Sequence, residues 1–183
     1  MTLGSLSSQM AQHIVLMNLV APLAVVVMLK QLRQRRIDIP DPGKWIAPAT
    51  VLKLGLLWFW HAPALQALHS PLMHWAMMAS LGASALLFWW AVLAPGERRW
   101  RALLALLTTS KLFCLLGVLL TFSPRPLYAG GHGAHGMAAD LLADQHLAGL
   151  LMLIACPATY LVAAVILAAR WLGSMDQRPA EAG

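Results

Sequence analysis

Five long apolar runs, separated by short connections, constrain this chain more than any other feature of its sequence. Their approximate ranges are 13–29, 45–65, 72–93, 102–122 and 146–169. Each is close to the roughly 20 residues that a helix needs to cross the hydrocarbon core of a bilayer. Helix is expected because an open strand would leave its amide groups without hydrogen-bond partners in lipid. The sequence therefore predicts an all-α, polytopic membrane helix bundle, a single domain over 1–183 with about five transmembrane helices.

Composition supports a membrane location and argues against several soluble classes. Apolar residues make up 60% of the 183 residues and charged residues only 11%, which is too little charge to cover a soluble domain of this size. The formal net charge of +6 does not indicate a nucleic-acid partner, because the basic residues form short clusters between apolar runs. No nucleophile constellation, phosphate-binding loop or dinucleotide fingerprint occurs, so an enzyme is not predicted. The apolar surface of the chain is therefore expected to face lipid.

The distribution of basic residues predicts the orientation of the bundle. Lys and Arg concentrate in the connections 30–44 and 95–101 and after residue 169, whereas the opposite side carries only Arg125 in the connection 124–145. Because Lys and Arg accumulate on the cytoplasmic side of membranes, the N-terminus is expected outside and the C-terminus in the cytoplasm. The expected location is the bacterial cytoplasmic (inner) membrane.

All seven histidines fall on the predicted outer side of this arrangement. They are His13, His61, His69, His74, His132, His135 and His146. A single histidine near lipid headgroups needs no functional explanation. The gathering of the whole set on one side favours a shared metal or cofactor site, since imidazole is the commonest metal-ligating side chain.

Methionines lie one or two helical turns deeper than several of these histidines. Met17 follows His13 by four residues and shares its helix face, and Met152 lies about 9 Å below His146 at 1.5 Å per residue. A single methionine in a membrane helix is usually a packing residue. Histidines above buried thioethers nevertheless suit Cu(I), a soft ion that accepts both ligand types. Zinc fits less well, because both cysteines lie deeper in the apolar runs.

Three charged residues near or within the apolar runs admit more than one interpretation. Asp144 is a suitable N-cap for a helix that begins near residue 146, but its carboxylate could also ligate a metal or orient a ligating imidazole. Lys111 lies near the middle of the fourth run with no acid at its depth, and we assign it no role. Lys53 lies nearer the inner interface and is expected to extend its ammonium toward the cytoplasm.

Five segments of the chain, taken in order, resemble the CtaG family of cytochrome c oxidase assembly factors, which are associated with maturation of haem-copper oxidases. The segments are Met10-Ala11-Gln12-His13 with Met17 and Ala21-Pro22-Leu23, Trp60-His61-Ala62-Pro63, His74 with Leu86-Leu87-Phe88-Trp89-Trp90, Gly117 with Leu120-Thr121-Phe122-Ser123-Pro124-Arg125-Pro126-Leu127-Tyr128, and Asp144-Gln145-His146-Leu147-Ala148-Gly149-Leu150-Leu151-Met152. They span nearly the whole chain. Leu153 departs from the aromatic residue often found there. Longer family members carry N-terminal helices that this chain lacks, which suggests that it works beside a partner.

The resemblance implies a role in oxidase assembly through copper handling, and the positions that carry over are His13, His61, His74, Asp144 and Met152. With Met17 added, these residues form the expected metal site. In the leading hypothesis the protein takes Cu(I) from an outer-face copper donor and passes it to a cytochrome c oxidase subunit by ligand exchange. The imidazoles would form the rim and the thioethers the floor, Asp144 would tune the site, and the loop with His132 and His135 would capture the ion first.

Two other classes of function stay open from the sequence. Histidines on facing helices are the usual axial ligands of haem, so the chain could be a b-type haem-binding protein that carries electrons. It could also be a structural accessory subunit of a respiratory complex in which the histidines are incidental. A transporter is disfavoured because no ligand set continues toward the inner face.

Overall fold

A computed structural model of the chain describes residues 5–37, 41–63, 70–94, 96, 99–127 and 135–176. Every regular element within these ranges is helical. The elements are α1 (Ser5–Val15), the π-helical segment η1 (Leu16–Val20), α2 (Ala21–Gln34), the 3-10 turn η2 (Pro42–Lys44), α3 (Ile46–Trp60), α5 (Pro71–Leu93), α6 (Arg99–Phe122) and α7 (His135–Asp176). The predicted all-α membrane bundle is confirmed.

Four helical stretches of the described chain are long and apolar enough to cross a membrane, and one is shorter. The four are Leu6–Gln34, Pro71–Leu93, Arg99–Phe122 and Ala139–Gly173. The shorter one, α3, has 15 residues, which rise about 22 Å and so fall short of the roughly 30 Å hydrocarbon core. The five predicted spans therefore correspond to four full-length candidates and one short apolar helix.

Two helices extend well beyond their predicted ranges. The first begins at Ser5 rather than near residue 13, so His13 lies inside the helix and does not begin it. α7 begins at His135 rather than near residue 146 and runs to Asp176. Both extensions contain polar residues, so they do not belong to the apolar runs from which the spans were predicted. As a result His13 lies within α1, and Asp144 and His146 lie within α7, instead of at helix ends.

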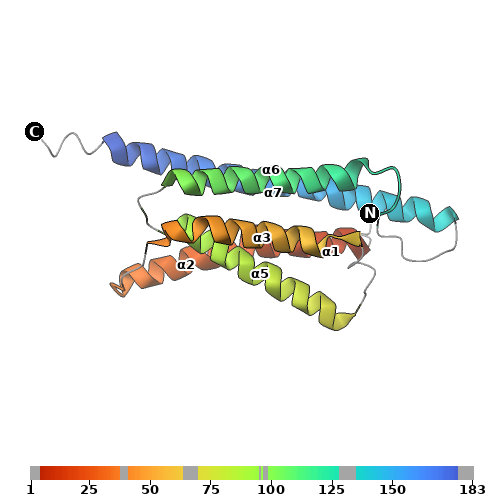
Figure 1. Ribbon diagram of the computed structural model, residues 1–183, viewed down its shortest axis with the longest axis horizontal. Coiled ribbons are helices and arrows are strands. Elements are labelled where there is room, and N and C mark those ends of the chain that lie inside the picture. The colour runs from red at the N-terminus through yellow and green to blue at the C-terminus, as the bar shows by residue number, and fades with distance from the viewer. Residues whose placement is uncertain are drawn as a thin grey trace, which may run out of the picture.

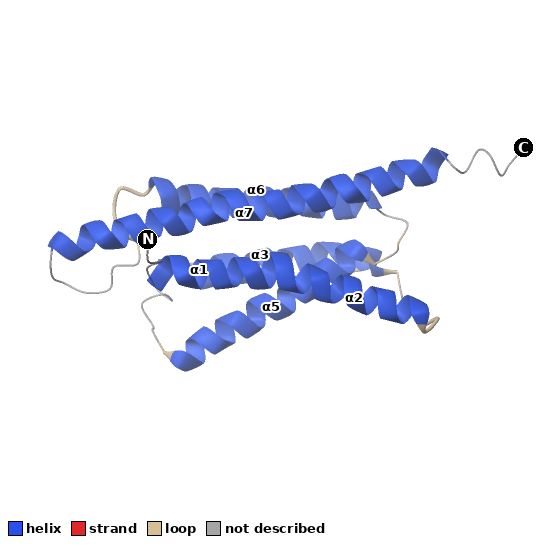
Figure 2. Ribbon diagram, turned by 180° about the vertical axis from the view of Figure 1, so that it is seen from behind, coloured by secondary structure: helices blue, strands red, loops and turns tan. Residues whose placement is uncertain are grey.

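The helices form two layers (Figures 1 and 2). α6 and α7 pair along their length in one layer, and α1, α2, α3 and α5 make up the other. Helices α1, α5 and α7 begin, and α3 and α6 end, at the same end of the bundle. His61 and His74 therefore lie toward one end, and the basic connections lie at the other. Which end faces the cytoplasm stays a prediction from the charge distribution.

The π-helical segment η1 has a local cause in the sequence. Pro22 has no N–H and cannot donate to the carbonyl of Asn18, and its ring would crowd that carbonyl in a regular α-helix. The N–H of Ala21 instead bonds to the carbonyl of Leu16, five residues earlier. The carbonyl of Met17 is thereby released from the helix ladder, and it accepts a hydrogen bond of 2.8 Å from Nε1 of Trp89. The π segment thus ties the first helix to α5.

Two glycines let α6 and α7 approach each other closely. A Cβ atom added to Gly149 would lie 2.8 Å from the backbone N of Thr121 and 2.9 Å from the carbonyl of Gly117. A Cβ atom on Gly117 would lie 2.9 Å from the side chain of Leu153. Small residues of this kind allow backbone contact between membrane helices. The crossing fixes the position of α7, which carries Met152 one turn further along.

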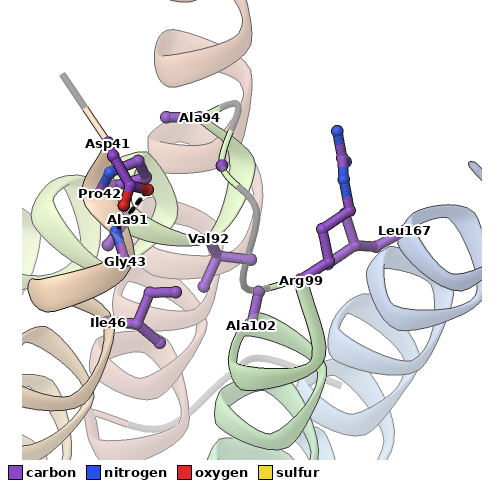
Figure 3. A pocket seen from close by; sticks show the side chains of 11 residues that line it. Asp41, Pro42, Gly43, Ile46, Ala91, Val92, Ala94, Arg99, Ala102 and Leu167 are labelled. Carbon is purple, nitrogen blue, oxygen red and sulfur yellow. Dashed lines mark hydrogen bonds between the residues drawn. The ribbon is translucent and has the colours of Figure 1, made fainter. Parts of the chain in front are cut away.

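The basic end of the bundle contains a small hollow of about 10 Å³ that has a structural explanation (Figure 3). The carboxylate of Asp41 accepts a hydrogen bond of 3.0 Å from the N–H of Gly43 and so caps η2. A Cβ atom on Gly96 would lie only 2.7 Å from Oδ1 of Asp41. Asp41 therefore holds the connection 30–44 close to Gly96 in the connection 95–101. We assign it no ligand.

Candidate metal site

A cavity of about 10 Å³ lies between the two layers, inside the half of the bundle that carries the histidines. Its lining residues come from four parts of the chain and are Met10, His13, Ile14, Met17, Leu57, His61, Phe113 and Met152. The first helix and α3 supply the imidazoles, and α6 and α7 supply Phe113 and Met152. The space is about what a single water molecule needs. The cavity is therefore suited to one small ion.

The ring of His61 is held with one nitrogen on the backbone and the other beside a thioether. Nδ1 lies 2.7 Å from the carbonyl oxygen of Leu57. Because a carbonyl only accepts, Nδ1 carries the proton, and Nε2 of the neutral ring keeps its lone pair. Nε2 lies 3.2 Å from Sδ of Met10, which is also a lone-pair donor. Two lone-pair donors facing each other at this distance are the arrangement that a bound cation stabilises.

His13 is the least satisfied polar side chain of the cavity. It is only 3% exposed, and both ring nitrogens lack a hydrogen-bond partner among the residues that the structure describes. Its ring centroid lies 6.1 Å from that of His61, with the rings nearly perpendicular. An unsatisfied buried polar group costs about 1–3 kcal/mol, and a bound ion is one of the explanations for such a group. Ligation of a metal through a lone pair of His13 would supply one.

The thioethers complete the donor set. Met10, Met17 and Met152 are each at most 2% exposed and line the same cavity. No group of three or more His, Cys, Asp or Glu side chains suited to a metal occurs in the described ranges. A metal held here would therefore depend on the methionines, and this dependence favours a soft ion.

The structure brings together only some of the residues that the sequence nominated. His13, Met17, His61 and Met152 line the cavity. His74 does not line it, but this half-buried residue lies close enough to interact electrostatically with His13. His69 and His132 lie outside the described residues, as does the side chain of His135.

Asp144 lies against the beginning of α1 and does not cap its own helix, so the expected N-cap role is wrong. Its carboxylate accepts hydrogen bonds of 2.9 Å from the N–H of Leu6 and 3.2 Å from the N–H of Ser7. It therefore caps the beginning of α1, where orphan amide groups and the helix dipole favour a negative charge. It does not cap its own helix, because α7 begins nine residues earlier at His135. Asp144 does not line the cavity, and its described hydrogen bonds go to the start of α1.

Sequence reasoning missed Met10 as a site residue. A signal was present, because Met10 precedes His13 by three residues and so lies one turn away on the same helix face. The prediction treated His13 as the first residue of its helix, and this left no helical turn in front of it. The polar start of α1, Ser5–Gln12, hid the helix that places Met10 in the cavity.

The prediction that Lys53 extends toward the cytoplasm is wrong. Its side chain is fully buried, and Nζ donates a hydrogen bond of 2.7 Å to the hydroxyl of Tyr160. That hydroxyl donates to Oδ1 of Asn18 at 2.8 Å, and Nδ2 of Asn18 donates to Sγ of Cys156 at 3.2 Å. The resulting chain of polar side chains links η1, α3 and α7 in the middle of the bundle.

An aromatic cage surrounds Lys53 and separates this polar chain from the cavity. Nζ lies 4.1 Å from the ring centroid of Phe88 and 5.8 Å from that of Phe113, distances at which a cation and an aromatic ring attract. Phe113 also lines the cavity. A lysine ammonium offers donors and no lone pair, so the ligand set ends at Phe113 and is not continued by Lys53.

A family model described as cytochrome c oxidase caa3 assembly factor, Caa3_CtaG, matches residues 2–174. The chain belongs to this family. The match confirms the resemblance found in the sequence, and it covers every residue that lines the cavity. Oxidase assembly is thus the broad role, association with the oxidase follows from it, and a non-catalytic function is indicated. No curated protein and no solved structure matches the chain.

Proposed function

We propose that this assembly factor holds Cu(I) in the cavity between its layers and passes it to a cytochrome c oxidase subunit. The observation that carries the proposal is the buried imidazole of His13, whose ring nitrogens have no hydrogen-bond partner in the described chain. It lies beside a lone-pair nitrogen of His61 and the sulfur of Met10. Copper is the cargo of this process and not a resident cofactor.

The donor types and the size of the cavity favour Cu(I) over other occupants. Imidazole and thioether together suit a soft monovalent ion, whereas carboxylate and water suit harder ions. The cavity of about 10 Å³ holds a single ion, while pockets for organic cofactors have roughly 300 Å³ or more. These facts weigh against the b-type haem alternative.

The positions of the ligands support transfer by ligand exchange through one end of the bundle. Half-buried His74 lies toward the same end of the bundle as His61 without lining the cavity, which suits a ligand that receives the ion from a donor and releases it to a recipient. Phe113 lines the cavity and also lies against the Lys53 ammonium, so the cavity is closed on the side of Lys53. An ion would therefore enter and leave on the same side. We propose an outer-face copper donor and an oxidase subunit as the two exchange partners.

Cu(I) titration of the purified full chain tests the proposal. The protein in detergent is titrated without oxygen against a chelator that colours on binding Cu(I), and we expect one tightly bound ion per chain. His13→Leu and Met10→Leu should each lower the Cu(I) affinity at least tenfold. His146→Leu is the matched control, because Nε2 of His146 lies 3.3 Å from the carbonyl of Ser123 and the residue does not line the cavity.

Two outcomes would overturn the proposed function. In the first, His13→Leu binds Cu(I) as tightly as the wild type, or His146→Leu weakens binding equally. In the second, the wild-type protein carries haem with its strong visible absorption and binds no Cu(I). The second result would favour the electron-transfer alternative.

A further inference from the structure

Lys111 presents a charged group to the lipid at the middle of a membrane-spanning helix. It is exposed and lies near the centre of the 24 residues of α6. The beginning of α6 is about 18 Å away along the helix axis at 1.5 Å per residue, which is far beyond the length of a lysine side chain. Leu107 and Leu115, one turn to either side, are 44% and 48% exposed. A cation in such surroundings is costly and marks a functional position.

In the part of the chain that the structure describes, Lys111 has no carboxylate partner on α3, α5 or its own helix α6. The seven acidic residues of the chain are Asp38, Asp41, Glu97, Asp140, Asp144, Asp176 and Glu181. None lies within α3, α5 or α6, and Asp41 and Asp144 are hydrogen-bonded at opposite ends of the bundle. A second copy of the chain would bring another lysine to this depth and no acid. A carboxylate on a different polypeptide would supply the counter-charge that α3, α5 and α6 lack.

A hollow of about 320 Å³ lies in the seam between α3 and α6, and its lining ends at Thr108, three residues before Lys111. It is lined by Ile46, Ala47, Thr50, Val51, Arg101, Leu104, Ala105 and Thr108. Thr108 and Lys111 share a helix face, and side chains lean toward the beginning of a helix, so Lys111 leans toward the hollow. Gly55, one turn beyond Val51, has open space where a Cβ would lie. Small residues along such a seam let another helix approach closely.

We propose that this face of α3 and α6, the Lys111 face, docks a membrane-spanning helix of another protein that carries an Asp or Glu near its midpoint. The carboxylate pairs with the Lys111 ammonium, and the hollow receives the side chains that flank it. Neither contact involves the copper cavity, so docking does not depend on the proposed cargo. Charge pairing at this depth replaces an exposed cation in lipid with a neutral pair, which gives the contact its specificity.

A designed helix provides a direct test of this surface. The probe is a polyleucine membrane-spanning helix with one Asp at its midpoint, and its association with the full chain is measured by energy transfer in phosphatidylcholine vesicles. We expect at least tenfold stronger association than for the same helix with Asn. Lys111→Leu should abolish the difference and Lys111→Arg should retain it. Thr108→Phe, which fills the hollow without changing charge, should weaken association severalfold.

A relocated lysine separates a docking surface from simple charge attraction. In the double variant Lys111→Leu/Ile154→Lys, the ammonium moves to a 71% exposed position of α7, away from the hollow. We expect this variant to bind the Asp helix no better than Lys111→Leu does. Equal binding by the relocated lysine would overturn the proposal, as would wild-type binding by Lys111→Leu. Self-association of the chain that Lys111→Leu abolishes would also overturn it, because the occupant would then be a second copy.

Discussion

The sulfur of Met10 lies 3.2 Å from Nε2 of His61, although the two residues are 51 positions apart in the chain. Both atoms carry lone pairs when the proton of His61 is on Nδ1, where the carbonyl of Leu57 requires it. The contact places a thioether and an imidazole from different helices at the wall of one cavity, beside the unsatisfied ring of His13. It is the centre of the candidate site.

Replacing His13 with Leu should raise the stability of the protein. The substitution removes a buried imidazole that has no hydrogen-bond partner in the described chain, so the free energy of unfolding should rise by about 1 kcal/mol. Thermal unfolding of the metal-free protein in detergent measures the effect. His61→Leu is the control, and it should lower stability because it removes the hydrogen bond to Leu57. A large destabilisation by His13→Leu would point to a structural role for this ring.

Replacing His61 with Ala should make oxidase activity depend on copper supply. At low copper, cells with this variant should contain copper-deficient oxidase of low activity, and added copper should restore part of the activity. His74→Ala should have the same kind of effect but a smaller one, because His74 does not line the cavity. Oxidase activity is compared at low and high copper with the level of each variant held equal. Full activity of both variants at low copper would remove these residues from the mechanism, and a loss unaffected by copper would favour a structural role.

Replacing Asp144 with Ala should change stability and leave copper binding alone. The carboxylate caps α1 through the N–H groups of Leu6 and Ser7, and loss of an N-cap costs about 1 kcal/mol. The measurements are thermal unfolding and Cu(I) affinity on the same preparation. We expect the affinity to stay within about twofold, since the nitrogen and sulfur donors are unchanged. A strong loss of affinity at unchanged stability would instead make Asp144 a ligand.

Replacing Gly149 with Ala should destabilise the pairing of α6 and α7. The new Cβ would lie 2.8 Å from the backbone N of Thr121, and overpacking of this kind costs about 1–3 kcal/mol. Gly173→Ala in the same helix is the matched control, because its Cβ would meet nothing within 4 Å, and it should be neutral or slightly stabilising. Unfolding midpoints in mixed detergent micelles compare the two. Equal midpoints for both variants would show that the crossing relaxes freely.

Replacing Tyr160 with Phe should destabilise the bundle more than replacing Lys53 with Met. The first change leaves Nζ of Lys53 and Oδ1 of Asn18 without the hydroxyl that they share, at about 2 kcal/mol. The second removes the group that needs a partner. The double variant should lose less than the sum of the two, because the side chains form one network. Additive losses in the unfolding free energies would mean that Lys53 and Tyr160 act independently.

A helix was predicted best from the sequence where its apolar run begins next to its own capping residue. α5 begins at Pro71, one residue before its predicted start, and Ser70 caps it by accepting a 3.1 Å hydrogen bond from the N–H of Met73. The beginning of α1 was missed because its cap, Asp144, is 138 positions away from Leu6. Its polar first turns also carry no membrane-spanning signal. Long-range capping of this kind leaves no local pattern.

Four of the eight residues that line the cavity were nominated from the sequence, and whether they bind a metal stays a prediction. His13, His61, Met17 and Met152 follow from histidines and methionines spaced along predicted helices. The partner of Lys53 is Tyr160, 107 positions later, and nothing in the neighbourhood of either residue indicates the pairing. Burial of a lysine depends on which helix supplies an acceptor at its depth, and this is decided by the tertiary arrangement that brings the Tyr160 hydroxyl of α7 to Lys53 of α3.

The π-helical turn at Leu16–Val20 contains one residue more than a turn of α-helix, so deletion of a residue there should affect the first helix differently from substitution. Its two halves, α1 and α2, are offset by about 100° relative to an uninterrupted α-helix, since each residue advances the helix by that angle. Deleting Leu16 would rotate Met10 and His13 together by about 100° relative to Met17, while leaving α2 seated against α5. Deletion of one residue would thus remove two ligands at once. Substitution, in contrast, can only remove them singly, and this asymmetry should be visible in any library that samples both kinds of change.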